Sequence, residues 1–452
     1  MNGHDVSGDV QDCDLLIERC AVLLPDLTVA ENHAIAIQGQ RIAAIGPMSE
    51  LRRTFSPRGM LDGTDKLAIP GLIDAHTHTA QHLLRGAVID ERPIVWQRIL
   101  IPFESKLTDE DIYHSARLAC LQMARAGITT FGDAGVLEVE GIIRAANEGG
   151  MRATISRFTA DEHNGLIPPW YADTTSAVIG KTEALFKQYD GTADGRLHIA
   201  FSITGPDNAS PALVEGAAAA ARRYGTILHI HVGQAETQHC LQRYGLRPVE
   251  YLAAYGAVGP NLLAAHAVRL SDREVMMLAE RDAKVVHCPE GNLLDLGFPK
   301  TPAMLALGIK VGLGTDGAKR SDLDLFYQMR LLKAALTAHA GVPVADAVVL
   351  PIHQAFRMPT AGSAAALGLE DAVGTLEAGK KADIVLLRWR EPHFFPAQRI
   401  FPMVFSVANA RDVNDVIIDG RLIVKDRVHQ LLDAEEVMAK AGERLSSILA
   451  RQ

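Results

Sequence analysis

Short apolar runs recur along the middle of the chain, and each is followed by a longer segment with helical spacing. Eight such runs lie between about Leu67 and Gly317: LAIPGLIDAHTH, ITTFGDAG, RATISRF, HIAFSITG, TILHIHV, NLLAAHAV, AKVVHCP and KVGLGTDG. They are unbroken rather than alternating, which is typical of parallel strands that are covered on both faces. The pattern therefore predicts eight buried, parallel strands.

The segments between these runs have the features of amphipathic helices. DEDIYHSARLACLQMARAG and SPALVEGAAAAARRYG, for example, begin at Asp or Ser and end at Gly, residues that are favoured at helix N-caps and C-caps. Eight strands that alternate with helices predict an α/β fold, a (β/α)8 TIM barrel over residues 67–370.

The two ends of the chain carry a different pattern. Short strand-like stretches separated by turn residues occur before the barrel, in CDLLIERCAVLLPD and HAIAIQGQRIAAIG, and after it, in KADIVLLRW and DVIIDGRLIVKDR. We predict a small β-sandwich domain assembled from both termini, residues 1–66 plus 371–432. A helix from about Ala434 to Leu449, within a C-terminal segment 433–452, is expected to end the chain.

Composition limits the partners. The chain of 452 residues is 48% hydrophobic and has a net charge of -9 without basic blocks, which argues against nucleic acid or an anionic membrane and favours a small-molecule substrate. The N-terminus has no signal-peptide pattern, and no apolar run is long enough to span a membrane, so a cytoplasmic protein is expected. The five scattered cysteines suggest neither a disulfide framework nor a CxxC metal site.

Histidines and one aspartate mark the ends of four predicted strands. His76 and His78 end the first strand, His231 the fifth, His266 the sixth and Asp316 the eighth. Active sites of such barrels lie at the carboxyl ends of the strands, and side chains two positions apart on a strand share a face. Three imidazoles and a carboxylate suit a divalent transition metal ion such as zinc, with a position left for water.

Two further features are interpreted as structural. His229 shares the face of His231 but lies deeper, which favours a hydrogen-bonded core histidine. Gly312 to Gly317 spells G-x-G-x-x-G, but it ends the last barrel strand and encloses Asp316 instead of opening a βαβ unit. This position argues against dinucleotide binding.

Longer stretches resemble the amidohydrolase superfamily, in particular its branch of triazine hydrolases and adenosine- and guanine-type deaminases. They include IPGLIDAHTHTAQHLLRG, VVHCPEGN, GIKVGLGTDG and GTLEAGKKADIVLLR, in the family's order. The resemblance implies one divalent metal ion, zinc in most relatives and otherwise iron, cobalt or manganese, held by His76, His78, His231 and Asp316. Water bound to this ion would be the nucleophile, Asp316 would relay its proton, and His266 would contact the substrate. The resemblance also implies a homo-oligomer.

The chain departs from this family beside His231. Family deaminases place a glutamate three residues after that histidine, where it protonates a ring nitrogen, whereas this chain has Gln234, followed by Glu236. The family's GPHAPYT is also replaced by GPDNASP, without its histidine. An amide cannot transfer a proton, so either Glu236 supplies it or the substrate is a carbonyl compound.

These observations leave two possible activities and one hypothesis without activity. Hydrolytic deamination of an amino-substituted N-heterocycle, of purine, pterin or triazine type, is the first prediction. Hydrolysis of an amide, urea or carbamate is the alternative that Gln234 favours. An inactive binding homologue is the rival from another class, and the complete set of metal-ligand residues argues against it.

The pocket is less well specified by the sequence. Several aromatic residues near predicted strand ends would form an apolar wall for a ring: Trp96, Phe103, Phe158, Trp170 and Phe326. Trp96 and Phe158, with His266 and Gln234, are the predicted substrate-binding residues. The segment 157–174 is long for a barrel loop and contains Pro168 and Pro169, so we predict a lid.

Overall fold

The computed structural model describes residues 10–92, 95–162, 167–317 and 322–451. Eight parallel strands stand side by side in chain order, which confirms the predicted barrel. The strands are β6 (Leu72–Thr77), β7 (Ile128–Asp133), β8 (Arg152–Ser156), β9 (Leu197–Ile203), β10 (Leu228–Val232), β11 (Leu262–His266), β12 (Lys284–His287) and β13 (Val311–Leu313). Each contains the centre of one predicted apolar run.

The barrel closes between its first and last strands. The backbone N–H of Asp316 donates to the carbonyl of His76 at 3.0 Å. The buried Asp74 carboxylate accepts from Thr315 N and Oγ1 at 3.0 and 2.6 Å. A Cβ at Gly314 would lie 2.5 Å from His76 O, so only glycine allows the two backbones to approach this closely.

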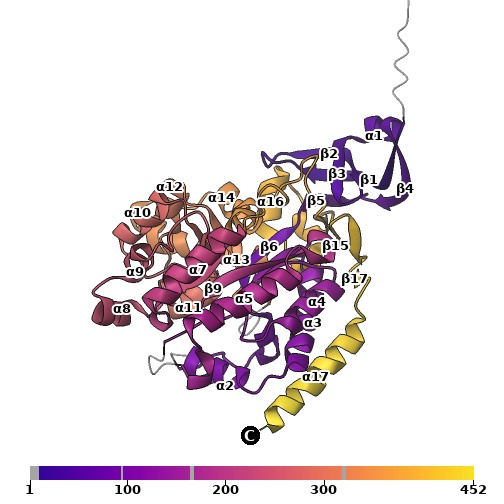
Figure 1. Cartoon of the computed structure of the whole chain (residues 1–452). Coiled ribbons are helices and arrows are strands. Elements are labelled where there is room, and N and C mark those ends of the chain that lie inside the picture. Colours follow the sequence, from indigo (N-terminus) through magenta and orange to yellow (C-terminus); the bar gives the residue numbers. More distant parts are fainter. Residues whose placement is uncertain (1–9, 93–94, 163–166, 318–321, 452) are drawn as a thin grey trace, which may run out of the picture.

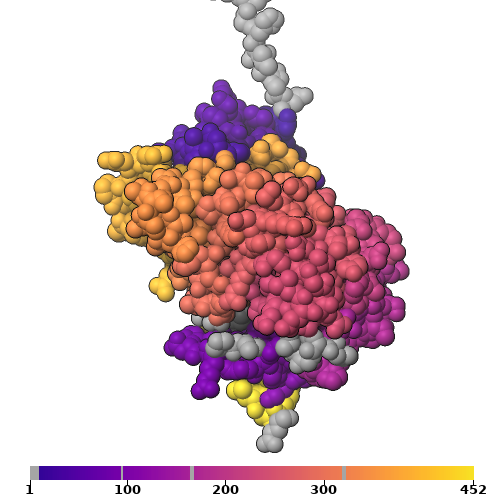
Figure 2. Space-filling view, turned by 90° about the vertical axis from the view of Figure 1, so that its left-hand side faces the viewer, coloured from indigo at the N-terminus to yellow at the C-terminus, as the bar shows by residue number. Residues whose placement is uncertain are grey.

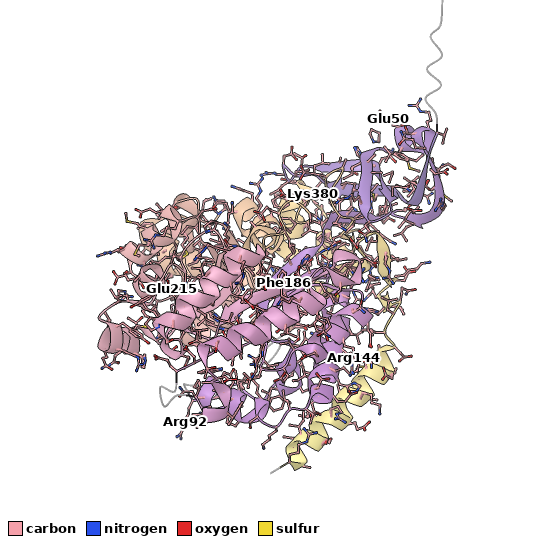
Figure 3. The ribbon with its side chains drawn as sticks, in the orientation of Figure 1. Glu50, Arg92, Arg144, Phe186, Glu215 and Lys380 are labelled. Carbon is pink, nitrogen blue, oxygen red and sulfur yellow. The ribbon has the colours of Figure 1, made fainter. Side chains whose placement is uncertain are left out.

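Helices cover the outside of the barrel, as Figure 1 shows for α5 and α7. The main ones are α3 (Asp109–Arg125), α4 (Glu140–Glu148), α5 (Thr175–Tyr189), α7 (Pro211–Tyr224), α8 (Thr237–Tyr244), α9 (Pro248–Ala254), α10 (Asp272–Glu280), α11 (Pro289–Asp295), α12 (Thr301–Ala306) and α13 (Leu325–Leu336). The predicted caps are present in α7, where Ser210 accepts from Leu213 N and Gly225 ends the helix at a φ of 66°. Phe186 of α5, labelled in Figure 3, packs on Tyr224 of α7 with ring centroids 4.7 Å apart.

A mixed sheet of nine strands is built from both ends of the chain. Its strands are β1 (Gln11–Leu23), β2 (Val29–Gln38), β3 (Arg41–Pro47), β4 (Phe55–Asp62), β5 (Lys66–Pro70), β14 (Ile384–Arg388), β15 (Val413–Ile418), β16 (Arg421–Lys425) and β17 (Val428–His429). Strands β5 and β14 pair antiparallel and join the two halves. We call this sheet the composite sheet; Figure 2 shows the indigo N-terminal part of the chain, which contributes β1 to β4, at one end of the molecule.

The first apolar run differs from the prediction of one strand. LAIPGLIDAHTH divides at Gly71 into β5, which belongs to the composite sheet, and β6, which begins the barrel. Pro70 has no N–H to continue a ladder, and a Cβ at Gly71 would lie 2.2 Å from Thr129 Oγ1. Residues 67–70 therefore lie in the composite sheet and not in the barrel.

A buried ion-pair network joins the barrel to the composite sheet. Arg152, at the start of β8, donates to both oxygens of Asp383 at 3.1 and 3.2 Å and to Asp419 Oδ1 at 3.1 Å. Lys381 Nζ lies 2.9 Å from the same Asp419 oxygen. Arg152, Asp383 and Asp419 are all nearly inaccessible to solvent, so each of these charges depends on its partners.

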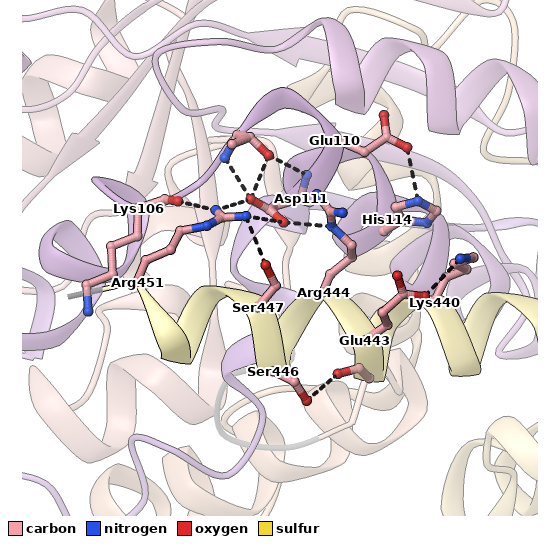
Figure 4. Close-up of polar contacts among 12 residues, drawn as sticks. Lys106, Glu110, Asp111, His114, Lys440, Glu443, Arg444, Ser446, Ser447 and Arg451 are labelled. Carbon is pink, nitrogen blue, oxygen red and sulfur yellow. Dashed lines mark hydrogen bonds and ion pairs between the residues drawn. The ribbon is translucent and has the colours of Figure 1, made fainter.

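The C-terminal helix α17 (Ala434–Ala450) lies along α3 at the edge of the barrel (Figure 1). Figure 4 shows the contact: Arg444 and Arg451 both donate to the Asp111 carboxylate of α3, and Arg451 also donates to the carbonyl of Lys106. The helix predicted from Ala434 is thereby fixed to the barrel. Among the described residues, no helix combines the length and the apolar character needed to cross a membrane.

Candidate metal centre

The structure brings the predicted ligand residues together at the carboxyl ends of the strands. His76 Nε2 and His78 Nε2 lie 3.6 and 3.4 Å from Asp316 Oδ1, and His78 Nε2 lies 3.4 Å from His231 Nε2. His266 faces the same centre, because one ligand atom each of His76, His266 and Asp316 lie within 4.8 Å of one another. Five residues from four strand ends thus converge on one point.

Hydrogen bonds orient the rings of two of these histidines. His231 Nδ1 lies 2.9 Å from the carbonyl of Thr204, and because a carbonyl only accepts, Nδ1 carries the proton. Its Nε2 then presents a lone pair to the centre. His76 Nδ1 lies 2.7 Å from His229 Nε2, and His229 Nδ1 lies 3.4 Å from Ser156 Oγ.

This places His229 directly behind His76. The sequence predicted a hydrogen-bonded core histidine, and His229 is indeed buried and hydrogen-bonded. Its partner, however, is His76 of the centre. A hydrogen-bond partner behind a metal-binding histidine holds the orientation of its ring, and His229 Nε2 occupies this place behind His76. The signal in the sequence was the position of His229 two residues before His231, on the same face of β10.

Burial sets the charge of the cluster. Desolvation holds the pKa of both His76 and His231 well below the ordinary histidine value, so both rings are neutral near pH 7. A neutral imidazole has a lone pair for a cation. His76 Nε2 is buried and has no hydrogen-bond partner among the described residues, a costly state that a bound cation would relieve.

The backbone at the strand ends is strained where the centre forms. Asp316 has a φ of 58° and His266 a φ of 71°, which are left-handed values that residues other than glycine seldom adopt. Such outliers cluster at functional sites because the surrounding structure holds them in place. The stretch Gly312–Gly317 ends β13 and leads into α13, and therefore opens no βαβ unit.

Gln234 and Glu236 lie on the turn between β10 and α8. The two Glu236 oxygens accept from the backbone N–H groups of Gly233 and Gln234. Burial, and next the charge of Asp207, raise the pKa of Glu236 to about 7. The Gln234 side chain is half-buried and makes no hydrogen bond to another described residue.

The predicted aromatic residues divide into two groups. Phe158 is buried and lies beside the rings of His78 and His231, at centroid distances of 5.7 and 5.9 Å. Trp96 is more distant and contacts Tyr171, which in turn contacts Phe158. Phe103 and Phe326, which the sequence also placed on the pocket wall, are buried in hydrophobic clusters, as Phe158 is in a third, and no ring contact between described residues joins either of them to the histidines of the centre.

The described part of the predicted lid segment contacts two outer helices, α7 and α8. Asp161 accepts from Ser210 at the start of α7, and Glu162 accepts from Arg243 and Tyr244 of α8. Trp170 is half-exposed and borders two cavities of about 340 and 440 Å³. Neither cavity is lined by a residue of the metal centre. Residues 163–166 of this segment lie outside the described ranges.

Known proteins place the chain among metal-dependent hydrolases. The profile of the amidohydrolase family matches residues 67–423. The chain is 35% identical over 447 residues to a 5-methylthioadenosine/S-adenosylhomocysteine deaminase of Pelotomaculum thermopropionicum, covering 97% of this chain and all of the relative. It is 34% identical to a 5'-deoxyadenosine deaminase of Methanothermobacter thermautotrophicus, with 91% and 98% covered.

Solved structures agree in fold. An adenosine deaminase from Xanthomonas campestris with bound zinc superimposes with a TM-score of 0.90 at 29% identity, covering 97% of this chain and 99% of the other. Atrazine chlorohydrolase from Arthrobacter aurescens TC1, complexed with zinc, gives a TM-score of 0.83 over 95% of this chain and all of the other. At 23% identity the second comparison shows the shared fold alone.

Proposed function

The chain belongs to the amidohydrolase family and hydrolyses carbon–nitrogen bonds of small molecules in a metal-dependent reaction, and we propose that it deaminates an amino-substituted N-heterocycle. The observation that carries this proposal is the convergence of three histidines and an aspartate at the strand ends. Two relatives that align over more than nine-tenths of the chain are named as deaminases of adenosine derivatives. This similarity supports a ring substrate.

We assign the cation to His76, His78, His231 and Asp316. The separations of 3.4 to 3.6 Å between their facing atoms are close to the roughly 3.4 Å expected between two tetrahedral ligands with bonds of about 2.1 Å. We propose zinc, because nitrogen and oxygen donors in this number suit it. A divalent cation bound here supplies Lewis acidity that lowers the pKa of water to about 7.

The side chains around the centre provide the remaining chemistry. Water adds to the ring carbon that bears the amino group, the carbon–nitrogen bond breaks, and one ammonia leaves for each water consumed. Asp316 accepts the proton of the attacking water and returns it to the leaving nitrogen. His266, which faces the same centre, stabilises the charge that develops on the substrate.

The ring nitrogen needs a proton of its own, and Glu236 is the acid that we propose. Glu236 regains this proton from the hydroxyl group of the addition intermediate when the ring carbonyl forms. A pKa raised to about 7 leaves part of this carboxyl protonated at neutral pH. Gln234 cannot serve in this way. The Glu236 side chain now accepts hydrogen bonds from the backbone N–H groups of Gly233 and Gln234. To deliver a proton to the substrate, it has to give up at least one of them.

Those two hydrogen bonds also favour a second candidate function. If Glu236 only fixes the turn, it does not protonate a ring nitrogen, and the second candidate substrate is an amide, urea or carbamate. Its oxyanion would need no protonation, because His266 would donate a hydrogen bond to it and a cation held by the four ligand residues would supply positive charge nearby. Asp316 then carries the proton to the leaving amine, and Gln234 binds the substrate by hydrogen bonds.

A substrate screen tests the proposal. Zinc-loaded and metal-stripped protein are compared for ammonia release from amino-purines, pterins and triazines, and for amine release from amides, ureas and carbamates. We expect ammonia from a ring substrate with the loaded protein only, and loss of both metal and activity in His78→Ala. Metal-dependent amine release without ring deamination would overturn the proposal in favour of the second candidate.

The Glu236→Gln variant separates the two candidates further. Ring deamination should fall by at least about 100-fold, the lower end of the contribution of a positioned general acid. Hydrolysis of a carbonyl substrate should change little. Glu215→Gln is the matched control, because Glu215 is exposed on the outer helix α7 (Figure 3). Near-normal ring deamination by Glu236→Gln would exclude this residue as the acid.

A further inference from the structure

We propose that Asn292 fixes the tautomer of His266, so that His266 presents an N–H donor to the substrate and is not a metal ligand. Asn292 is thus a positioning residue that acts through His266. The proposal rests on the proposed function, which it deepens by separating the four cation ligands from the fifth residue of the cluster.

Distance alone does not make this separation. His266 lies with its ring centroid 5.0 Å from that of His76 and 5.5 Å from that of His231. Its ligand atom also falls within 4.8 Å of those of His76 and Asp316. A histidine in this position ligates a cation if its inner nitrogen has a lone pair, and donates to a substrate if that nitrogen has a proton. The tautomer therefore decides its role.

The backbone of Cys288 determines how the Asn292 amide is turned. One side-chain position of this amide lies 3.3 Å from Cys288 O, and the other lies 3.2 Å from Cys288 N. A carbonyl can only accept and a backbone N–H can only donate. The amide nitrogen must therefore face Cys288 O and the amide oxygen must face Cys288 N. Asn292 is fully buried, so no water replaces these partners at its surface.

The same orientation points the amide nitrogen at His266. That nitrogen lies 2.9 Å from His266 Nδ1 and donates to it. Nδ1 is then the acceptor, and the proton of the neutral ring is on Nε2. The main chain of His266 is held as well, because His287 Nδ1 lies 2.8 Å from its carbonyl. Cys288, Asn292 and His266 thus form a chain of hydrogen bonds whose direction is set by the backbone.

The direction of this hydrogen-bond chain explains how one histidine cluster can both bind a cation and donate a hydrogen bond to the substrate. His231 presents a lone pair to the cation, because its Nδ1 donates to Thr204 O. His76 presents one when its Nδ1 donates to His229 Nε2, which lies 2.7 Å away. His266 has the opposite polarity and presents Nε2–H. A preorganised donor of this kind stabilises charge that develops on the substrate during water attack. It also keeps His266 from competing for the cation.

Nuclear magnetic resonance of protein labelled with 15N-histidine tests the tautomer without any need for activity. In metal-free wild-type protein, the His266 signals should show the pattern of the Nε2–H tautomer; His266→Gln identifies them by their loss. In Asn292→Asp, the carboxylate can only accept, so His266 should change to the Nδ1–H tautomer. An Nδ1–H pattern in the wild-type protein would overturn the proposal, even if the variant fails to fold.

Steady-state kinetics test whether the His266 tautomer matters for catalysis. Asn292→Asp should lower kcat by about 100- to 1000-fold, the loss that follows removal of one preorganised donor, with a change in KM of less than about 3-fold. Asn261→Asp is the matched control, because the Asn261 amide donates to Thr226 O at the opposite end of β11. An altered tautomer with unchanged kcat would overturn the role of His266 as donor. A wild-type protein that has the Nε2–H tautomer but deaminates no ring would overturn the proposed function alone.

Discussion

Single residues behind the metal centre set the direction of each imidazole. Three of the converging histidines have a defined partner for their outer nitrogen: His229 for His76, Thr204 O for His231 and Asn292 for His266. A neutral imidazole binds a cation only through a nitrogen whose lone pair faces that cation. The outer partners therefore contribute to metal binding through the ligands that they orient.

We expect His229→Ala to weaken zinc binding by about 10- to 100-fold, the usual effect of removing such an outer partner. The His76 ring loses the hydrogen-bond partner 2.7 Å from its Nδ1 and is free to turn or to change tautomer. Competition of the protein with a chromophoric chelator measures the affinity. His429→Ala, which removes a buried imidazole from β17, is the control. Equal zinc affinity in His229→Ala and the wild-type protein would contradict the role of His229.

The sequence pointed to the residues at the strand ends but not to their partners. His76, His78, His231, His266 and Asp316 could be found because each follows a recognisable apolar run, and the ends of parallel strands meet at one rim. The partnership of His76 and His229 spans 153 positions and depends on how the barrel is closed. No local pattern carries that information. The same is true of Asn292, whose orientation depends on the backbone of Cys288.

The helix α17 is attached to the barrel by charges as well as by buried apolar residues, among them Val437 and Ile448. Burial opposes ionisation of Asp111, but hydrogen bonds from Arg451, Thr108 and Arg444 outweigh it and lower the pKa of Asp111 to about 2. Because Asp111 is also part of the capping box of α3, one carboxylate both begins α3 and holds α17 (Figure 4). The sequence predicted a helix from about Ala434 to Leu449, and α17 spans Ala434–Ala450. Its docking partner Asp111 is more than 300 positions away.

We expect α17 to loosen at acid pH and in Asp111→Asn. The pKa of Asp111 is lower in the folded state, at about 2, than its ordinary value of 3.8. Its contribution is therefore fully present above about pH 4 and is lost as the pH falls towards 2. The shift corresponds to about 2 kcal/mol. Hydrogen exchange of the α17 amides measures the effect.

The control for this prediction is Asp109→Asn. Asp109 is an exposed acidic residue in the same first turn of α3, where an acidic side chain contributes only about 0.3 to 1 kcal/mol through the helix dipole. Exchange in α17 should rise in Asp111→Asn and stay near the wild-type level in Asp109→Asn. Equal exchange in both variants would show that apolar contacts alone hold the helix.

At the scale of the whole molecule, the barrel and the composite sheet are joined both by the chain and by charge. The chain passes directly from β5 in one to β6 in the other, and Arg152 of the barrel pairs with Asp383 and Asp419 of the composite sheet. The prediction of two parts followed from the two kinds of apolar pattern. The junction was not predicted, since an arginine and two aspartates far apart in sequence give no sign of being paired.

We expect Arg152→Met to destabilise the protein by about 3 to 5 kcal/mol, because it leaves two buried carboxylates without their shared guanidinium. Arg58→Met is the control: its ion pair with Asp14 is largely exposed and contributes at most about 1 kcal/mol.

Two spectroscopic probes follow the unfolding of the two parts separately. In a background of Trp96→Phe and Trp170→Phe, the fluorescence of Trp389, which follows β14, reports unfolding of the composite sheet. Far-ultraviolet circular dichroism reports unfolding of the barrel helices. The two urea transitions should coincide in the wild-type protein and separate in Arg152→Met, with the Trp389 transition at the lower urea concentration. Coincident transitions at an unchanged midpoint would show that the strand connection alone, without the buried charges, makes the two parts unfold together.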